Sequence, residues 1–189
     1  MHLLEPHYNW RDFYTAEEDI NSPFYGKIYS EFEFHHAIYD HVIHPQWDYF
    51  GSNTLYLKIL FTDYTNNFCI IEMIGEWNDL LYNDIMYLKR NIIEHLLYKG
   101  INKFILIGEN VLTFHNDGDD YYQEWFDEVE DGWIVGLNFQ DNVIEEFSVA
   151  NIDYYITTGG VFDNIPWRTL HPQQLFKKIN ETIMKRLGE

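Results

Sequence analysis

The chain from residue 54 onward carries two kinds of hydrophobic pattern, one typical of strands and one typical of helices. The runs TLYLKILFTDY (54–64) and NFCIIEMIGEW (67–77) are rich in β-branched and aromatic residues and meet at TNN, which predicts a β-hairpin. Over 79–98 the apolar positions recur every three to four residues, which predicts a helix that ends before Gly100. Its inner stripe is predicted to contain Leu81, Ile85, Leu88, Ile92 and Leu96, widened by Met86, Ile93 and Leu97.

Strand and helix patterns continue to alternate toward the C-terminus. The predicted strands are KFILIGE (103–109), GWIVGLNF (132–139) and IDYYIT (152–157), and the predicted helices cover 120–129, 141–150 and the segment from Pro172 onward. Asp119 or Asp120 is expected to cap the first of these helices, and Asp141 the second. The inner stripe of the last helix is predicted to contain Leu175, Phe176, Ile179, Ile183 and Leu187.

This order of elements predicts an α/β fold with a largely parallel or mixed β-sheet, right-handed crossovers and flanking helices, opened by the hairpin. A flavodoxin-like three-layer sandwich is the alternative, because it would give a similar alternation. Residues 1–50 differ from the rest, since they are rich in aromatic residues and histidines. Within them, IYSEFEFHHAIYDHVI (28–43) predicts one or two strands or an arm wrapped on the core. We therefore expect an N-terminal extension, 1–50, packed on an α/β domain, 51–189.

Several stretches of this α/β region resemble STAS domains, the anti-sigma-factor-antagonist fold, and the related SpoIIAA-like proteins. IIEMIGEWND resembles their second strand and its turn into the first helix, and INKFILIGENVLTFHNDGDD resembles their central strand and functional loop. GWIVGLNFQDNVIEEFSVANIDYYI and PQQLFKKINETI resemble the closing strands and helices. The resemblance is one of order, length and pattern, and it implies a regulatory module that binds a partner protein. The chain is also similar to uncharacterised proteins of Bacteroidota.

The loop that corresponds to the functional loop departs from the family pattern. Antagonists of this kind are switched by phosphorylation of a Ser or Thr in the loop, whereas the loop here reads HNDGDD and contains no hydroxyl group. Asp117, Asp119 and Asp120 supply permanent negative charge in its place. Carboxylates at a helix N-terminus are also favourable by roughly 0.3–1 kcal/mol each, which is a purely structural reason for their presence.

Composition narrows the classes of partner. The 189 residues have a formal net charge of −19, which disfavours binding to nucleic acid and to anionic lipid because both need Lys and Arg. A basic protein or a cation fits this charge better, and solubility alone is the remaining explanation. The start of the chain does not read as a signal peptide, and no segment approaches the ~20 apolar residues of a membrane span. A cytoplasmic location, with the single Cys69 buried, is the expectation.

The acidic stretch after the central strand is the first candidate site. Between Lys103 and Arg168 the chain contains no Lys or Arg, while acids continue throughout. If the helices over 120–129 and 141–150 are neighbours, their polar faces merge into one acidic surface, which would dock a basic protein. The residues expected to make contact are Asp117, Asp119, Asp120, Glu124 and Glu128. The alternative is that both helix faces are simply solvated.

Two weaker candidates involve other chemistry. HHAIYDHVIHPQWD (35–48) is the densest histidine cluster, and the possible metal ligands in it are His36, Asp40, His41 and His44, although no HExxH motif is present. The candidate catalytic residues are Glu76, Glu109 and His115, which are expected at the carboxyl ends of strands, where open α/β sheets place ligands. No nucleotide-binding or nucleophile motif is visible, so no cofactor is expected.

The leading hypothesis is a non-enzymatic protein-interaction or regulatory module with an acidic docking face. The first alternative is an enzyme with a carboxylate/His or metal site at the strand ends. The second is a small-ligand or lipid-binding domain that uses the N-terminal aromatic residues, among them Trp10, Tyr14, Trp47 and Phe50.

Overall fold

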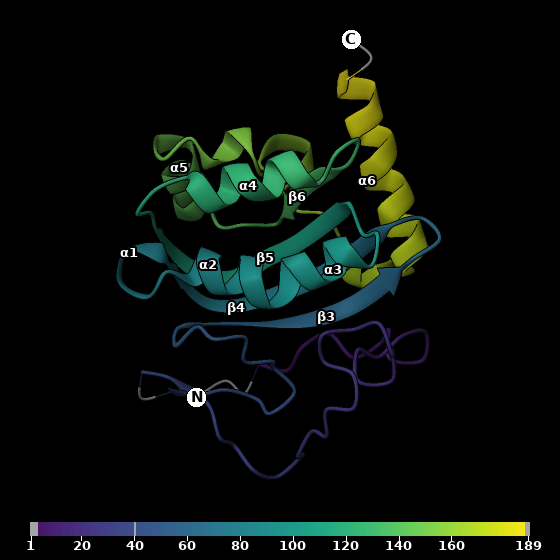
Figure 1. The fold of residues 1–189 in the computed structure, drawn as a ribbon, viewed down its shortest axis with the longest axis vertical. Helices are drawn as coiled ribbons and strands as arrows, with labels where there is room; N and C mark the ends of the chain where they lie inside the picture. The colour runs from purple at the N-terminus through teal and green to yellow at the C-terminus, as the bar shows by residue number, and fades with distance from the viewer. Residues whose placement is uncertain (1–3, 40, 188–189) are drawn as a thin grey trace.

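A computed structural model describes residues 4–39 and 41–187, without the side chain of Leu187. Its main sheet has four strands in the order β3-β4-β5-β6, and Figure 1 shows them stacked one above the other. β3 (Leu55–Asp63) pairs antiparallel with β4 (Phe68–Asn78), whereas β4, β5 (Lys103–His115) and β6 (Trp133–Leu137) are parallel. The predictions of a hairpin and of a mixed sheet with flanking helices are therefore confirmed.

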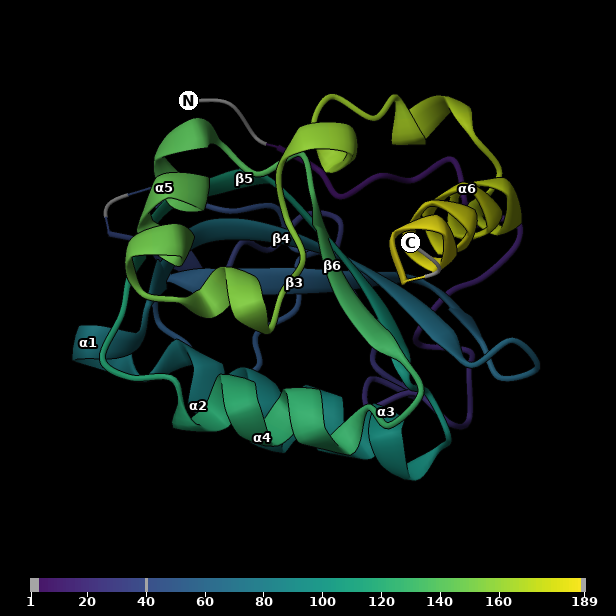
Figure 2. The same cartoon turned by 90° about the horizontal axis from the view of Figure 1, so that it is seen from above.

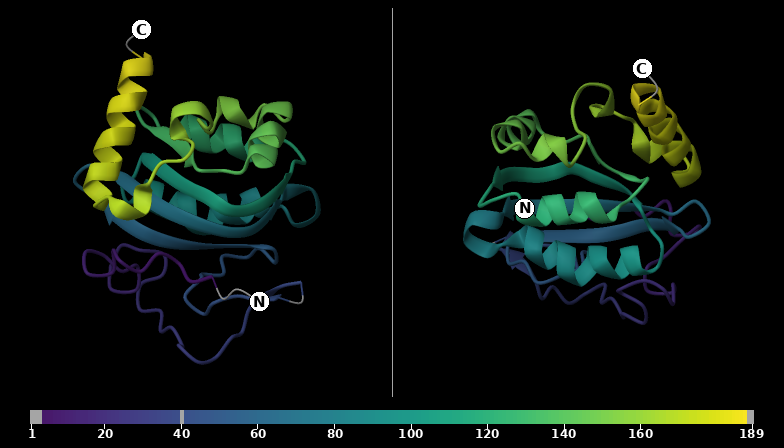
Figure 3. Two further views of the ribbon diagram at one scale, coloured as in Figure 1. Left: turned by 180° about the vertical axis from the view of Figure 1, so that it is seen from behind. Right: turned by 45° about the horizontal axis from the view of Figure 1, so that its top comes forward.

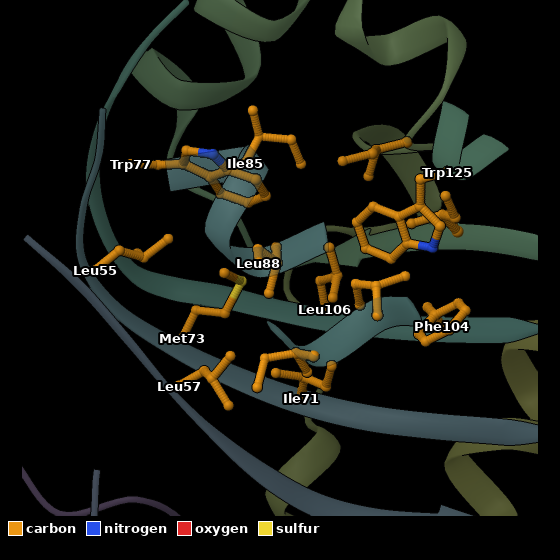
Figure 4. Close-up of a cluster of buried hydrophobic side chains, with 14 of the residues drawn as sticks. Leu55, Leu57, Ile71, Met73, Trp77, Ile85, Leu88, Phe104, Leu106 and Trp125 are labelled. Carbon is orange, nitrogen blue, oxygen red and sulfur yellow. The ribbon is translucent and has the colours of Figure 1, made fainter. Parts of the chain in front are cut away.

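One face of this sheet is covered by five helices. They are α1 (Asp79–Tyr82), α2 (Asp84–Leu88), α3 (Glu94–Tyr98), α4 (Asp120–Glu128) and α5 (Asp141–Val149). Figure 2 shows α2 and α4 side by side, and Figure 4 shows the side chains that fill the space between helices and sheet. Alternate residues of β3, β4 and β5 point into this core. Trp125 of α4 packs over them and has no exposed surface.

The opposite face is covered at one end by α6 (Pro172–Leu187), which Figure 3 shows lying across the sheet in the view from behind. Pro172 is the first residue of this helix, as predicted, because proline fits the first helical position. Leu175, Ile179 and Ile183 are buried against Phe68, Ile105 and neighbouring side chains, and Phe176 stacks on Phe68. The predicted role of Leu187 lies outside the described side chains.

The segment 79–98 is not the single helix that its periodicity predicts. Asn83 adopts the left-handed conformation (φ 53°) and separates α1 from α2, and a π-helical turn, η1 (Lys89–Ile93), separates α2 from α3. Because α1 is only one turn, Leu81 points outward and is 71% exposed, so its predicted place on the inner stripe is wrong. The remaining stripe residues are buried as predicted: Ile85, Leu88, Ile92 and Leu96.

The predicted strand over 152–157 is also wrong. Ile152–Tyr154 forms a 3-10 helix, η2, and only Thr157 makes a bridge to Val135 of β6. The apolar residues that pack here are Ile152 and Ile156, which are four residues apart and joined by a backbone hydrogen bond of 2.9 Å. Helical spacing of two buried residues therefore outweighs the high strand propensity of the tyrosines between them. Short 3-10 turns η3 (Gly160–Phe162) and η4 (Trp167–Thr169) follow.

Strand β5 is longer than the predicted segment 103–109, since it continues to His115. Beyond Leu137 the strand β6 no longer accompanies it, and the start of α5 covers the free edge instead. The side-chain amide of Gln140 donates to the carbonyl of Glu109 (3.3 Å), and that of Asn142 donates to the carbonyl of Leu112 (2.9 Å). Asp141, predicted as the cap, is the first residue within the helix, and Gln140 occupies the cap position.

The N-terminal segment wraps around the outer edge of β3. Trp10 packs on the side of α6, whereas Phe24 and Phe50 pack with the helical core. At the edge itself, Asp48 exchanges two backbone hydrogen bonds with Leu57 (2.7 and 3.2 Å), which occupies groups that an open edge would expose. Among the described residues of the segment, regular strands are β1 (Ala37–Ile38) and β2 (His41–Val42), so the segment 28–43 contains two short strands within an otherwise irregular arm. Figure 1 shows it below β3, on the far side from α4 and α5.

No helix in the described part of the chain combines the length and the apolar character that crossing a membrane requires.

Gly75 of β4 is expected to tolerate substitution poorly. Its φ of +119° disfavours any side chain, and a Cβ there would lie 2.1 Å from the carbonyl oxygen of Thr54. Gly26 has a φ of +73° but open space around the same position, so it is the matched control. We expect Gly26→Ala to cost about 1–2 kcal/mol through backbone strain alone and Gly75→Ala to cost clearly more. Urea denaturation of both variants measures this, and equal losses would show that the contact with Thr54 is unimportant.

Candidate functional site

The acidic loop lies at the point where β5 ends and α4 begins. Asp117 and Asp120 are exposed, and neither makes an ion pair with any other described residue. Asp119 is the N-cap residue of α4, but its carboxylate does not cap the helix and instead accepts a hydrogen bond from the Tyr155 hydroxyl (2.8 Å). The loop therefore presents two uncommitted carboxylates and one that is tied to η2.

Glu124 and Glu128, the other predicted contact residues, form ion pairs with residues of η1, and Glu128 remains 43% exposed. The fully buried ammonium of Lys89 lies 3.3 Å from Glu124 and 2.7 Å from Glu128. Arg90 donates two hydrogen bonds to Glu124 (2.6 and 3.0 Å), and these bonds lower the pKa of that carboxyl group. Both acids thus join α4 to the π-helical turn η1.

An exposed aromatic group adjoins the loop on its other side. Phe126 of α4 packs against Tyr154 and Tyr155, with ring centroids 5.6 and 5.9 Å apart. Tyr154 remains 71% exposed and Phe126 38% exposed. The sequence analysis did not identify this patch, because it assigned the tyrosines to a strand in the sheet. Adjacent tyrosines between helically spaced isoleucines were the signal that could have indicated it.

Beneath the loop, Asp79 is a buried carboxyl group at the end of β4. One oxygen accepts from the Tyr122 hydroxyl (2.6 Å), and the other accepts from the Ile85 backbone N–H (2.8 Å) and the Trp77 indole N–H (3.1 Å). Burial raises the pKa of Asp79 to about 7, and the hydrogen bonds act in the opposite direction. Asp84 is buried beside it and accepts from the Asn78 backbone N–H (2.8 Å). These aspartates join β4, α2 and α4, so their role is to position the loop.

A cavity of about 100 Å³ lies above Asp79 and is lined also by Asn83, Asp117, Asp120 and Tyr121. The acids around it do not converge as metal ligands do. In the described ranges, no group of three or more His, Cys, Asp or Glu side chains could hold a metal ion.

The candidate metal ligands of the N-terminal segment make separate contacts. His36 stacks on Tyr49 (5.5 Å between ring centroids), and burial lowers the pKa of its imidazole. The ring of His44 meets the edge of Phe34, and its Nδ1 accepts from the Gln46 backbone N–H (3.2 Å). His41 is exposed in β2. Asp40, the fourth candidate, lies outside the described residues.

The candidate catalytic residues do not share one site. Glu76 and Glu109 are not beyond the strand ends, since both lie within strands, and their backbones are separated by several register positions. The Glu76 carboxylate accepts a hydrogen bond from the Tyr39 hydroxyl (2.7 Å), whereas Glu109 forms an ion pair with Arg168. His115 is exposed at the last position of β5.

Another buried carboxyl group, Glu72, lies beside Glu109 under the N-terminal segment. Burial raises the pKa of Glu72 to about 7, while the backbone N–H of His7 (2.8 Å) and the guanidinium of Arg168 (3.5 Å) act in the opposite direction. Arg168 also lies over the ring of Trp167. A carboxyl group with a pKa near 7 beside a carboxylate held in an ion pair is an arrangement that acid–base catalysis can use. Here, however, Arg168 and the His7 segment cover both groups.

Among known proteins, the chain resembles solved structures in fold. No protein-family profile and no curated protein matches the chain. Among solved structures it is similar to the unphosphorylated anti-sigma factor antagonist SpoIIAA, with 11% identity, 56% of this chain and 89% of that chain covered, and a TM-score of 0.41. It is also similar to a Thermotoga maritima protein described as a candidate anti-sigma factor antagonist, with 15% identity, coverage of 56% and 86%, and a TM-score of 0.40. These likenesses concern the fold alone, and they agree with the STAS/SpoIIAA-like resemblance of the sequence.

The raised pKa of Asp79 predicts a pH dependence of stability. Since the folded protein binds this proton more tightly than the unfolded chain, the contribution of Asp79 is fully present below about pH 4 and is lost as the pH rises through about 7. Each unit of pKa shift corresponds to about 1.4 kcal/mol. We expect wild type to lose more free energy of unfolding between pH 5 and pH 8 than Asp79→Asn, as measured by urea denaturation.

Two features make this measurement specific to Asp79. Glu72 titrates in the same range but is present in both proteins, so its effect cancels in the difference. Tyr122→Phe removes a hydrogen bond that lowers the pKa of Asp79, and it should therefore move the pH-dependent loss to higher pH. Parallel profiles for wild type and Asp79→Asn would contradict the assignment.

Proposed function

We propose that this protein is a non-enzymatic interaction or regulatory module that binds a basic protein through the surface around the start of α4. The observation that carries the proposal is the proximity of exposed carboxylates to exposed aromatic rings. Asp117, Asp119 and Asp120 occupy the loop, and Phe126 and Tyr154 lie next to it.

The two components of this surface make different contributions to binding. The carboxylates lie within a stretch, 104–167, that has no Lys or Arg, so the local field is negative and would draw a basic partner toward it. Such charges mainly increase the rate of association and orient the partner. The aromatic rings provide apolar area that becomes dehydrated on contact, and aromatic residues are frequent among the dominant contacts of interfaces.

The ion pairs between α4 and η1 limit the proposed contact surface on one side. Glu124 and Glu128 are engaged by Lys89 and Arg90, so the proposed contact surface extends from the loop toward η2 rather than toward α2. Because the loop has no hydroxyl group, its charge does not depend on phosphorylation. The single cysteine, Cys69, is a free and buried thiol, which is compatible with action in the cytoplasm.

Neutralisation of the loop tests the electrostatic part of the proposal. In affinity capture from native lysate with quantitative mass spectrometry, wild type should retain a basic protein that about 0.5 M salt releases, because surface charges are screened at that ionic strength. Asp117→Asn/Asp119→Asn/Asp120→Asn should lose that protein. The matched control, Asp12→Asn/Glu18→Gln/Glu31→Gln, removes the same charge from exposed positions on the N-terminal segment.

The outcomes separate a specific surface from general acidity. If the control loses the same protein, the capture depends on net charge alone and the proposal fails. Tyr154→Ser tests the aromatic part, since it should accelerate dissociation of the captured protein without changing the dependence of association on salt. Retention of the same proteins by wild type and the loop variant would also contradict the proposal.

A further inference from the structure

A pocket of about 670 Å³ lies on the side of the sheet that faces the N-terminal segment, away from the proposed docking surface. Its floor comes from β4 and β5, and its cover comes from Leu4 and the β1–β2 hairpin. The apolar residues that line it are Leu4, Ile38, Val42, Ile43, Ile74 and Leu112. A volume of this size lies within the range of small-molecule sites, which are mostly apolar with a few polar groups that orient the ligand.

Local backbone features hold the hairpin over the floor. Gly75 leaves room for Ile38, because a Cβ at that glycine would lie 2.8 Å from the Ile38 side chain. The Tyr39 hydroxyl donates an exposed hydrogen bond to Glu76 (2.7 Å), which joins Tyr39 to β4. Tyr39 itself has a φ of 52°, a strained conformation for a residue with a side chain. Backbone strain of this kind is frequent where a segment clamps a ligand.

Two polar side chains from β4 and β5 line the floor of the pocket, Glu76 and Asn110. Glu76 supplies a carboxylate that accepts the Tyr39 hydroxyl at one of its oxygens. Asn110 lines the same pocket, and its side-chain N–H₂ is buried without a hydrogen-bond partner among the described residues. Because a buried donor without an acceptor costs free energy, the amide favours a ligand that brings an oxygen to it.

A peptide added as a further strand does not fit this position. At the free edge of β5 next to the pocket, two backbone carbonyls are already occupied. The carbonyl of Glu109 accepts from the Gln140 side-chain amide, and that of Leu112 accepts from the Asn142 side-chain amide. Strand addition needs those backbone groups. A small molecule that enters between the hairpin and the floor needs none of them.

We propose that this pocket binds a small cationic amphiphile, whose apolar part contacts Val42 and Leu112 and whose positively charged end lies at Glu76; an oxygen on the ligand would in addition satisfy the Asn110 amide. Charge complementarity selects the cation, since Glu76 is the acidic group among the described residues that line the pocket, and the chain as a whole carries −19. His41 also lines this pocket and is exposed. This proposal is independent of the docking surface on α4.

Three probes with the same alkyl chain and different ends test it: decyltrimethylammonium, decanol and decanoate. Isothermal titration calorimetry at pH 8, below the micelle concentrations, should show decyltrimethylammonium binding to one site and at least about tenfold tighter than decanoate. Glu76→Gln should abolish the preference for the cation while the alkyl contribution remains, because glutamine still accepts the Tyr39 hydroxyl. Binding at many weak sites, or an unchanged preference in Glu76→Gln, would overturn the proposal.

A pair of leucines distinguishes the pocket from the rest of the surface. Leu112 is 54% exposed within the pocket, and Leu80 is 58% exposed outside it. Leu112→Gln should weaken binding of decyltrimethylammonium and decanol about tenfold or more, whereas Leu80→Gln should leave both unchanged. Equal effects of the two substitutions would overturn the proposal. So would a dimer of wild type in light scattering that Leu112→Gln alone dissociates, because a second copy would then occupy the pocket.

Discussion

The burial of β4 and β5 on both faces is the constraint from which the rest of the structure follows. Their central residues have almost no exposed surface on either side: Ile70, Ile71, Ile105 and Leu106. A strand that is apolar on both faces needs a cover on each, and the exposure of either face would cost about 25 cal/mol for each Å² of apolar surface. The helices between the strands cover one face, as crossover connections require.

The second face lacks a full set of helices, and this explains the N-terminal segment. α6 covers only one end of that face. Residues from the first quarter of the chain, with Trp10 and Trp47 at their centre, cover the remainder and occupy the outer edge of β3. The segment is therefore part of the fold, although it contains little regular structure of its own.

The contact between this segment and the sheet is more polar than the helical core. The carboxylate of Asp48, which has no exposed surface, accepts from Lys27 (2.5 Å) and Tyr29 (2.6 Å). Lys58 is almost fully buried above the Tyr29 ring. Buried ion pairs of this kind add little net stability but are costly to break singly, so they favour one position of the segment over others. The pocket under the hairpin lies along the same contact, which is where a cover with little regular structure can leave space.

The two proposed surfaces thus belong to different parts of the architecture. The docking surface lies where a strand leads into a helix, at the edge where α/β sheets commonly place functional groups. The amphiphile pocket lies on the opposite side and depends on the N-terminal segment. Because Gly75 and Glu76 of β4 line that pocket, its shape depends on the strand that leads directly into α1 and Asp79 beneath the loop.

The sequence by itself determined the elements whose pattern is local. Alternating and helically spaced apolar residues located the hairpin, β5, β6, α4, α5 and α6, because side-chain periodicity follows directly from backbone geometry. Only the tertiary structure decided the features that depend on partners distant in the chain. Glu124 and Glu128 turned toward Lys89 and Arg90, residues 152–154 became a 3-10 helix between two packed isoleucines, and Glu72 came to lie under His7. The physical reason is that ion pairs, burial and pockets arise from distances between elements, and no periodicity within one element specifies those distances.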